Sequence, residues 1–337
     1  MKTTSGVTRS LSIIGTGMYV PEKFVSSSEV DKNLDRPEGF SLKLSGPNKR
    51  HVMEEGSSSS MAAKAAYIAL KEAGLEPSDI NLIISASAVS EQPIPSQAAL
   101  VARHLGLSGS GIPAYDVNAT CLSFLAAIDT FSDSISAGRY KHVLVISSEV
   151  ASRGLNWDDP VNAVLFGDGA AAAILRTEPE ESDLGIISSL FETYPEGADF
   201  CQLRSGGTAL RSQHGMDKFL KGEKYEMDGV SAYKLTAKVF PDFLKRLLNS
   251  AKLGMDEIDL VIPHQASAAA LDHLVSLLEI PTEKIVNIYG DYGNQIAASL
   301  PTALHIARTT GKMKEGMTVL LAGTGAGITL GGMVIKV

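Results

Sequence analysis

Two stretches of the chain have the apolar spacing of amphipathic helices, and each is followed by a short apolar run. Apolar side chains recur at helical intervals over residues 61–71 and again over residues 232–248. After a short loop, each stretch reaches an uninterrupted apolar run, 82–84 in the first case and 260–262 in the second. Such runs are typical of strands that are buried on both faces of a sheet. The pattern therefore predicts two helix–loop–strand units in a mixed α/β protein.

These two units belong to a longer internal repeat. The segment that starts at Ala73 resembles the one that starts at Ala251, which is 251 − 73 = 178 positions later. Two further matches follow in the same order, residues 114–117 with 288–291 and residues 143–146 with 319–322. We therefore expect two duplicated halves, residues 1–177 and 178–337, which meet in the polar, helix-breaking segment near residues 177–184.

Composition and charge exclude several classes of protein. The chain has 30 Lys and Arg against 38 Asp and Glu, a formal net charge of −8, whereas a nucleic-acid-binding protein needs a basic face. No run approaches the ~18 uncharged apolar residues that a membrane helix needs, and no secretory pattern is visible. Two cysteines suit a reducing compartment, and the seven histidines lack metal-ligand spacing. We expect a cytoplasmic protein with no membrane span, no nucleic-acid partner and no bound metal.

The segment 191–226 has little periodicity and is rich in Gly, Ser and Lys. We interpret it as an excursion over the surface or across a partner subunit. Cys201 and His214 within it have no partner spacing, so we interpret them as a packed thiol and a loop residue.

Cys121 stands where a predicted buried strand turns into a helix. Downstream of it, Leu122, Leu125, Ile128 and Phe131 recur at helical spacing, so the cysteine lies at a helix N-terminus. The free N–H groups and the helix dipole favour a thiolate there, which is the nucleophilic form of cysteine. By itself the feature fits a buried packing cysteine equally well.

Two polar residues of the second half occupy matching places. His264 directly follows the predicted strand 260–263, and ligands of open α/β sheets bind at such strand ends. Asn294 aligns with Cys121 at an offset of 294 − 121 = 173, so two facing turns would bring these residues together, with His264 beside them. A cap or a core hydrogen bond is the ordinary role of either residue taken alone.

The glycine-rich turn 323–327 does not belong to a dinucleotide-binding motif. That motif needs a helix after the turn, and the ten residues that follow here do not predict one. We interpret it as a source of backbone N–H donors that line a pocket. The turns at 15–17 and 166–170 also lack the helix that this motif needs.

Four motifs together resemble the beta-ketoacyl-acyl-carrier-protein synthase III family of the thiolase superfamily. They are DVNATC at 116–121, LFGDGA at 165–170, IPHQAS at 262–267 and YGNQIAAS at 292–299. The resemblance implies an α/β thiolase fold, with five αβαβα layers from two duplicated halves, and a homodimer. It also implies a catalytic triad of Cys121, His264 and Asn294.

The resemblance further implies the chemistry. The Cys121 thiolate takes an acyl group from a thioester, and the N–H groups of Cys121 and Ala326 hold the oxyanion. A malonyl thioester then loses carbon dioxide, and His264 and Asn294 stabilise the enolate that attacks the acyl group. The expected substrates are acyl-CoA and a malonyl thioester, the expected partner is an acyl carrier protein, and no permanently bound cofactor is expected.

Several positions depart from the family pattern. The segment 38–50 lacks the Trp that family members usually carry there, and the single Trp of the chain is Trp157. The Arg that the family places shortly before Phe166 is also missing, and Pro160 stands near that position. A carrier-docking Arg expected after the histidine motif is replaced by the run of alanines at 268–270. Carrier docking could instead use Lys218, Lys221 and Lys224, or Lys245, Arg246 and Lys252.

The loop 90–96 would cap the acyl tunnel of the partner subunit. Its capping position, often Phe in the family, is Ile94, which predicts a primer that is longer or more branched than acetyl.

Four other functions stay open. The protein could condense two long acyl-CoA molecules without decarboxylation, as in bacterial olefin synthesis, with a base from the partner loop near Glu91. It could also pass the acyl group to an alcohol or amine, hydrolyse thioesters, or serve as a non-catalytic partner subunit.

Overall fold

The computed structural model describes residues 6–337; the first five residues, part of the stretch considered above for export, lie outside the described residues. Among the described residues, nine strands are hydrogen-bonded in the order β11-β12-β13-β8-β1-β7-β6-β4-β5. They are β1 (Arg9–Tyr19), β4 (Leu82–Ser85), β5 (Ala114–Asp116), β6 (His142–Glu149), β7 (Gly169–Thr177), β8 (Gly185–Thr193), β11 (Leu260–Pro263), β12 (Thr318–Gly325) and β13 (Thr329–Lys336).

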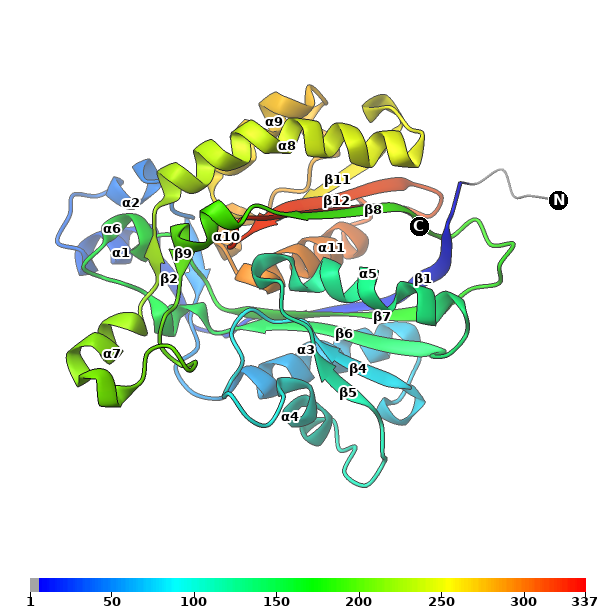
Figure 1. The fold of residues 1–337 in the computed structure, drawn as a ribbon, viewed down its shortest axis with the longest axis horizontal. Coiled ribbons are helices and arrows are strands. Elements are labelled where there is room, and N and C mark those ends of the chain that lie inside the picture. The colour runs from blue at the N-terminus through cyan, green and yellow to red at the C-terminus, as the bar shows by residue number, and fades with distance from the viewer. Residues whose placement is uncertain (1–5) are drawn as a thin grey trace.

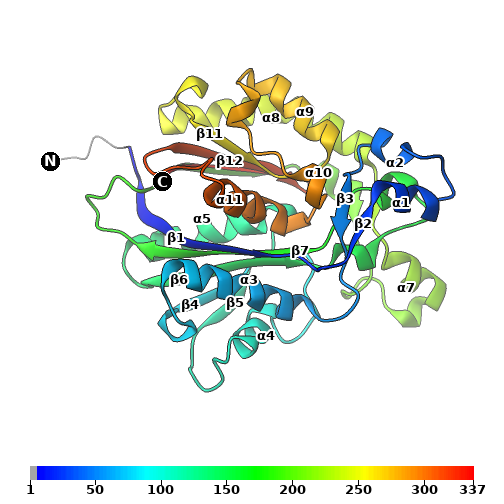
Figure 2. The same cartoon turned by 180° about the vertical axis from the view of Figure 1, so that it is seen from behind.

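The strands form two stacked sheets, and helices cover each outer face and fill the space between them (Figure 1 and Figure 2). The two sheets are joined only where β1 pairs with β8, through Arg9 with Ile186 and Ser10 with Gly185. This five-layer arrangement is the predicted αβαβα architecture. Its layer-forming helices are α3 (Ser58–Ala73) and α4 (Gln97–His104) on one side, α5 (Ser123–Ser136) and α11 (Ser299–Thr309) in the centre, and α8 (Gly229–Ala251) and α9 (Ala268–Leu278) on the other.

Smaller elements gather at one end of the layers (Figure 1). They are β2 (Phe24–Ser26), α1 (Ser27–Asn33), α2 (Phe40–Lys43), β3 (Lys49–His51), α6 (Pro160–Ala163), β9 (Cys201–Gln202), α7 (Met216–Gly222), β10 (Glu226–Met227) and α10 (Tyr289–Tyr292).

The central helices are apolar on most sides because each packs between two sheets. Phe124 and Leu125 of α5 and Leu300 and Leu304 of α11 are fully buried in one apolar cluster. That cluster also contains Leu82 of β4 together with strand residues of the second half. A single core therefore spans both halves of the chain.

The predicted helices and strands of the repeat are present with extended bounds. The helix predicted at 61–71 is α3, which begins after the capping hydroxyl of Ser57 and ends at Gly74 in a left-handed conformation (φ 67°). The helix predicted at 232–248 is α8. The proposed division at residue 177 coincides with the end of β7, and the halves remain a proposal.

Two predictions about local structure are wrong. The match of residues 114–117 with 288–291 does not hold in the structure, because Ala114–Asp116 form strand β5 whereas Tyr289–Tyr292 form the short helix α10. The segment 191–226 is not only a surface excursion: it contains the end of β8, the β9–β10 pair and α7. It also turns inward, because Leu203 and the buried Tyr225 pack in the apolar cluster that contacts Cys121.

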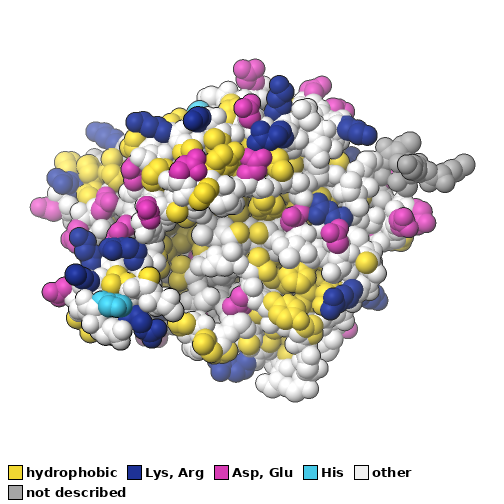
Figure 3. Space-filling view, viewed as in Figure 1, with side chains coloured by type: hydrophobic (Ala, Val, Ile, Leu, Met, Phe, Trp, Pro, Cys, Tyr) yellow, Lys and Arg dark blue, Asp and Glu magenta, His cyan; other side chains and the backbone are white. Residues whose placement is uncertain are grey.

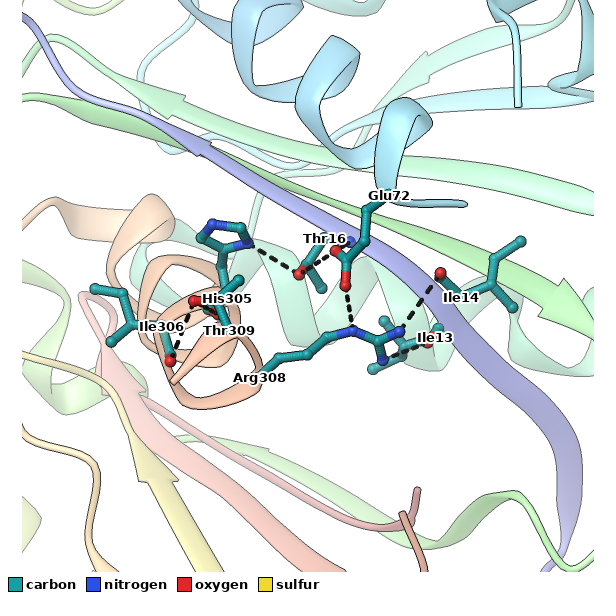
Figure 4. A network of polar contacts seen from close by, with 8 residues as sticks. All are labelled: Ile13, Ile14, Thr16, Glu72, His305, Ile306, Arg308 and Thr309. Carbon is teal, nitrogen blue, oxygen red and sulfur yellow. Dashed lines mark hydrogen bonds and ion pairs between the residues drawn. The ribbon is translucent and has the colours of Figure 1, made fainter. Parts of the chain in front are cut away.

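A polar network ties an outer helix to a central helix through the sheet (Figure 4). Glu72 of α3 accepts hydrogen bonds from the backbone N–H of Thr16 (2.6 Å) and from Arg308 Nε of α11 (2.7 Å). Arg308 also donates to the carbonyl oxygen of Ile13 (2.9 Å), next to the irregular register of β1 between Ile13 and Gly15. Burial opposes ionisation of Glu72, but the hydrogen bonds from Arg308 and Thr16 outweigh it and lower the pKa of the carboxyl.

We expect Glu72→Ala to lower the free energy of unfolding by about 1–3 kcal/mol, because the N–H of the buried Thr16 loses its acceptor and Arg308 loses its carboxylate partner. Part of this stabilisation should disappear as pH falls below 4.5, since the folded pKa is the lower one. Urea unfolding at pH 7 and pH 4 measures both effects. Lys71→Ala, on the exposed surface of the same helix, is the control, and an equal loss in both variants would contradict the role of the network.

Within residues 6–337, no helix is both long and apolar enough to cross a membrane. The same residues contain no group of three or more His, Cys, Asp or Glu side chains arranged to hold a metal ion.

Candidate active site

Two turns with the same internal hydrogen bonds meet at the centre of the molecule. In the first half, Asn118 Oδ1 accepts from the N–H of Thr120 (2.9 Å) just before the short helix η2 (Thr120–Leu122). In the second half, Asn294 Oδ1 accepts from the N–H of Ile296 (2.8 Å) before η8 (Ile296–Ala298). Thr120 and Ile296 even share a left-handed backbone, with φ of 53° and 51°.

The structural counterpart of Cys121 is therefore Ala297, and the counterpart of Asn294 is Asn118, at a shared offset of 294 − 118 = 176. The predicted correspondence of Cys121 with Asn294 is wrong. The reason is an unequal connection between strand and turn. The bridge Val261↔Ile285 takes the place of the Ile83↔Ala114 pairing. Asn294 therefore lies nine positions after Ile285 (294 − 285), whereas Asn118 lies four positions after Ala114 (118 − 114). Helix α10 accommodates the difference.

Cys121 lies in η2 directly before α5, at a helix N-terminus as predicted. The expected stabilisation of a thiolate is not observed. Burial raises the pKa of the Cys121 thiol, the charges of Cys201 and Glu149 add to this effect, and a backbone hydrogen bond from Ala326 opposes it. The resting site therefore holds a thiol, and the backbone N–H groups of Ala326 and of Cys121 itself are the neighbouring groups that favour its ionised form.

His264 follows β11, and its N–H donates to the carbonyl oxygen of Ala322 in β12 (2.9 Å). The residue is 6 % exposed, and its ring Nδ1 is buried without a hydrogen-bond partner among the described residues. Burial lowers the pKa of His264 to about 4. The imidazole is therefore neutral near pH 7, with one N–H to donate.

Asn294 is held from both sides. Its backbone N–H donates to the carbonyl oxygen of Leu165 (2.9 Å), and its own carbonyl accepts from the N–H of Gly167 (3.0 Å). Its side-chain Nδ2 donates to the carbonyl oxygen of Ala266, two residues after His264 (3.2 Å). This bond fixes the carboxamide next to the histidine turn and leaves a second Nδ2 hydrogen for a ligand.

The glycine-rich end of β12 lies against both turns. A Cβ atom on Gly323 would lie 2.5 Å from His264 Cβ. One on Gly325 would lie 2.4 Å from Thr120 Oγ1 and 3.5 Å from the backbone nitrogen of Cys121. The strand therefore needs glycine at both positions, and the next residue, Ala326, brings its N–H to the thiol.

Glu149 was missed by the sequence analysis. It is fully buried at the end of β6, and its carboxyl accepts from the N–H groups of Ala88 (2.5 Å) and Val89 (3.3 Å) and from that of Ala297. Burial raises its pKa to about 8. Extending the match of 143–146 with 319–322 by three positions aligns Glu149 with Gly325. The Glu149 carboxyl in the first half thus occupies the place that corresponds to the glycine-rich backbone beside Cys121 in the second half.

Tyr225 was also missed. Its ring is 7 % exposed and stacks on Phe166, with centroids 4.8 Å apart. Both rings belong to the apolar cluster against which Cys121 packs. Tyr225 lies in the irregular segment, where no periodicity could reveal an inward-facing residue.

Ile94 is 84 % exposed, and so available to a partner subunit. Trp157 is 40 % exposed and packs against the buried Arg50, whose guanidinium carbon lies 5.6 Å from the ring centroid.

The glycine-rich end of β12 lies against both the histidine turn and the cysteine turn in a five-layer fold, and this arrangement points to the class of condensing acyltransferases. Two family models, for the 3-oxoacyl-[acyl-carrier-protein] synthase III and its C-terminal part, match residues 115–195 and 248–337. The chain belongs to the 3-oxoacyl-[acyl-carrier-protein] synthase III family. This membership confirms the predicted family and enzyme class.

Relatives match along nearly the whole chain. The beta-ketoacyl-[acyl-carrier-protein] synthase III of Clostridium acetobutylicum is 33 % identical over 327 residues, which cover 97 % of this chain and 98 % of the relative. The crystal structure of the Aquifex aeolicus synthase III superposes with a TM-score of 0.87 at 30 % identity, covering 97 % and 100 % of the two chains. The priming beta-ketosynthase of the R1128 polyketide pathway has a TM-score of 0.86 at 25 % identity and covers 97 % and 96 %. The thiolase fold is thereby confirmed.

The depressed pKa of His264 predicts a pH-dependent stability. Unfolded histidine binds a proton near pH 6.5 and folded His264 only near pH 4, so the unfolded state binds more protons in this window. We expect the free energy of unfolding to fall by up to about 3 kcal/mol from this group as pH drops from 6.5 to 4. Denaturant titrations of wild type and His264→Ala across this range measure the difference in slope, and parallel slopes would show that the folded histidine protonates normally.

Proposed function

We propose that the protein makes 3-oxoacyl thioesters in two steps, at the start of fatty-acid synthesis or of a related lipid or polyketide pathway. In the first step, Cys121 takes an acyl group from acyl-CoA or an acyl carrier protein. In the second step, a malonyl thioester loses carbon dioxide and its α-carbon attacks the acyl group. The main support is the contact of β12 with both turns, which brings donors for two oxyanions to one place.

The first oxyanion forms on the acyl carbonyl when sulfur attacks. The N–H groups of Cys121 and Ala326 favour negative charge at the sulfur, and we assign to them the two hydrogen bonds to the carbonyl oxygen of an attached acyl group. Because burial keeps the resting group protonated, the thiol loses its proton as it attacks, and the thiolate of the departing donor gains one.

The second oxyanion is the enolate that decarboxylation leaves behind. A neutral His264 with Nε2 protonated and the free Nδ2 hydrogen of Asn294 supply two N–H donors to it. Nδ1 of His264 is buried without a partner. With the proton on Nε2, the unpaired Nδ1 is an acceptor, which costs less free energy than an unpaired buried N–H donor would.

The decarboxylative reaction is favoured over condensation of two acyl-CoA molecules by the state of Glu91. Its carboxylate accepts from the N–H (2.9 Å) and hydroxyl (2.6 Å) of Ser59 in α3. Burial works against ionisation, but the hydrogen bonds from Ser59 lower the pKa of Glu91. A carboxylate engaged in this way is a poor base to deprotonate a substrate in a partner subunit.

The proposed assembly is a cytoplasmic homodimer in which Ile94 of each subunit covers the acyl site of the other. The exposed apolar side chain at the tip of the loop supports this proposal. No resident cofactor or metal enters either step.

Carrier docking is proposed at helix α7. Lys and Arg side chains gather over this region (Figure 3), where Lys218 and Lys221 accompany the exposed Met216 and Leu220. The helix leads directly into Tyr225, which packs in the cluster that Cys121 contacts. An acidic carrier bound there would deliver its acyl arm close to the thiol.

Asn294→Asp tests the division into two steps. The carboxylate keeps an acceptor for the N–H of Ile296 but loses both donors and repels an enolate. We expect the variant to form the acyl adduct on Cys121, while discharge of the adduct by malonyl thioester slows at least about 100-fold. Intact-protein mass spectrometry over time measures both steps.

Cys121→Ala should form no adduct, whereas Cys201→Ala, which removes the other cysteine, should form it normally. Adduct formation by Cys121→Ala, or normal discharge by Asn294→Asp, would refute the proposed roles.

Tyr225→Ala tests which residue limits the primer. Removing the ring that stacks on Phe166 opens space in the cluster beside Cys121. We expect the preferred acyl adduct to shift to chains several carbons longer, measured in competition between acyl-CoA primers from acetyl to tetradecanoyl. Tyr67→Ala, which removes an exposed ring of α3, serves as control, and an unchanged preference in Tyr225→Ala would assign the limit to Ile94 and the partner subunit.

A further inference from the structure

The capping loop, residues 86–96, connects β4 to α4 and carries Ile94 at its tip (Figure 1). The proposed function places this tip over the acyl site of the partner subunit. Residues 92–95 are all exposed, so packing within their own subunit does not hold them. The position of the tip therefore depends on how the rest of the loop is anchored.

The root of the loop is bonded to the same groups that hold the two turns of the site. The N–H of Ala88 donates to the carboxyl of Glu149 (2.5 Å), and its carbonyl oxygen accepts from Asn118 Nδ2 (2.8 Å). Glu149 also accepts from the N–H of Ala297 in η8, and Asn118 accepts from that of Thr120 in η2 (2.9 Å). The root of the loop is therefore fixed to the body of its own subunit.

The far end of the loop is fixed at the start of α4. The carboxylate of Asp116 accepts from the N–H groups of Gln97 and Ala98, at 2.8 Å each. The buried amide of Gln97 in turn accepts from the N–H of Glu91 (3.0 Å) and donates to the hydroxyl of Ser58 in α3 (3.0 Å). Gln97 thus ties the middle of the loop to both outer helices.

Glu91 supplies the anchor that lies nearest to the tip on this side of the loop, three positions before Ile94. Its carboxylate accepts from both the N–H and the hydroxyl of the buried Ser59, in the first turn of α3. A negative charge is favoured at this end of a helix. The carboxylate therefore fastens the loop to a rigid element just before the loop leaves the body of the subunit.

We propose that Glu91 is a positioning residue, which holds the capping loop in place and thereby limits the length of the primer that the partner subunit accepts. The inference rests on the proposed function. A tip that is fixed by hydrogen bonds behind it cannot yield at low cost to a longer acyl chain, because a precise site needs supporting bonds that lock the groups in contact with the ligand. Without the carboxylate, Ile94 is free to move aside.

Mixed dimers test this inference, because the loop acts on the opposite subunit. Two differently tagged copies are expressed together, and dimers with one copy of each are purified in two affinity steps. One subunit, called silent, carries Cys121→Ala, so that only the other, live subunit can form the adduct on Cys121. Acyl-CoA primers from acetyl to tetradecanoyl compete for this cysteine, and intact-protein mass spectrometry measures each adduct.

The readout is the amount of adduct two carbons longer than the preferred one, divided by the amount of the preferred one. We expect Glu91→Ala in the silent subunit to raise this ratio at least about tenfold in the live subunit. The same substitution in the live subunit should leave the ratio unchanged. An unchanged ratio in the first arrangement, or an equal rise in both, would overturn the inference.

Two control substitutions in the silent subunit separate the anchor from charge alone. Glu91→Gln keeps an oxygen that can accept from Ser59, so we expect it to retain the wild-type preference. Glu55→Ala removes an exposed carboxylate outside the loop and should also leave the preference unchanged. If either control raises the ratio as much as Glu91→Ala does, the anchor is not the cause and the inference is wrong.

Discharge of the adduct by malonyl thioester is measured on the same dimers. We expect Glu91→Ala to leave the rate of discharge of any one adduct within about threefold of the wild-type rate. A loss of discharge without a change in primer preference would give Glu91 a part in the chemistry, and the positioning role would be refuted.

Ile94→Ala in the silent subunit serves as the reference for capping. If Ile94→Ala shifts the preference and Glu91→Ala does not, only the inference fails. If neither substitution shifts it, the proposed capping fails and the inference with it. If the live wild-type subunit forms no adduct from any primer, the proposed function itself fails.

Discussion

The close approach of β12 to the two catalytic turns is the constraint on which the site depends. Gly323 and Gly325 lie two positions apart and so face the same side of the strand. A methyl group on the first would overlap the side chain of His264, and one on the second would overlap Thr120, next to Cys121. Only bare backbone fits between the histidine turn of one half and the cysteine turn of the other, and this contact carries the N–H of Ala326 to the thiol.

In the function we propose, the two halves divide the chemistry between them. The proposed nucleophile belongs to the first half, and the proposed donors for decarboxylation belong to the second half. At the matching strand end of the first half, Glu149 replaces the glycine, and its carboxyl takes the N–H groups of Ala88, Val89 and Ala297. The two halves therefore differ at this place, since Ala297 stands in the position that corresponds to Cys121. Both arrangements bury polar groups, at a cost to stability that the continuous apolar core must offset.

Much of this could be predicted from sequence, because a repeat and four motifs report on the backbone framework. The position of Cys121 at a helix N-terminus and the position of His264 after a strand follow from periodicity, whereas the five layers follow from the resemblance that the four motifs carry. The predicted correspondence of Cys121 with Asn294 failed because α10 lengthens the connection between strand and turn in the second half. A comparison of short segments does not reveal such an insertion. The prediction of a thiolate at Cys121 failed because burial raises the pKa of the thiol more than the helix N-terminus lowers it. Burial is a property of the packed fold and cannot be seen in the sequence. Tyr225 comes from a segment without periodicity, so only its packing against Phe166 reveals it.

The most direct test of the account is a single turnover with a malonyl thioester that carries a ¹³C label in its free carboxylate. Cys121 is first acylated, excess donor is removed, and the labelled substrate is added. The account predicts that all of the label leaves as carbon dioxide, while one 3-oxoacyl thioester forms for each adduct lost and Cys121 returns to the free thiol. Label retained in the condensation product, or release of the primer as free acid without carbon dioxide, would contradict it.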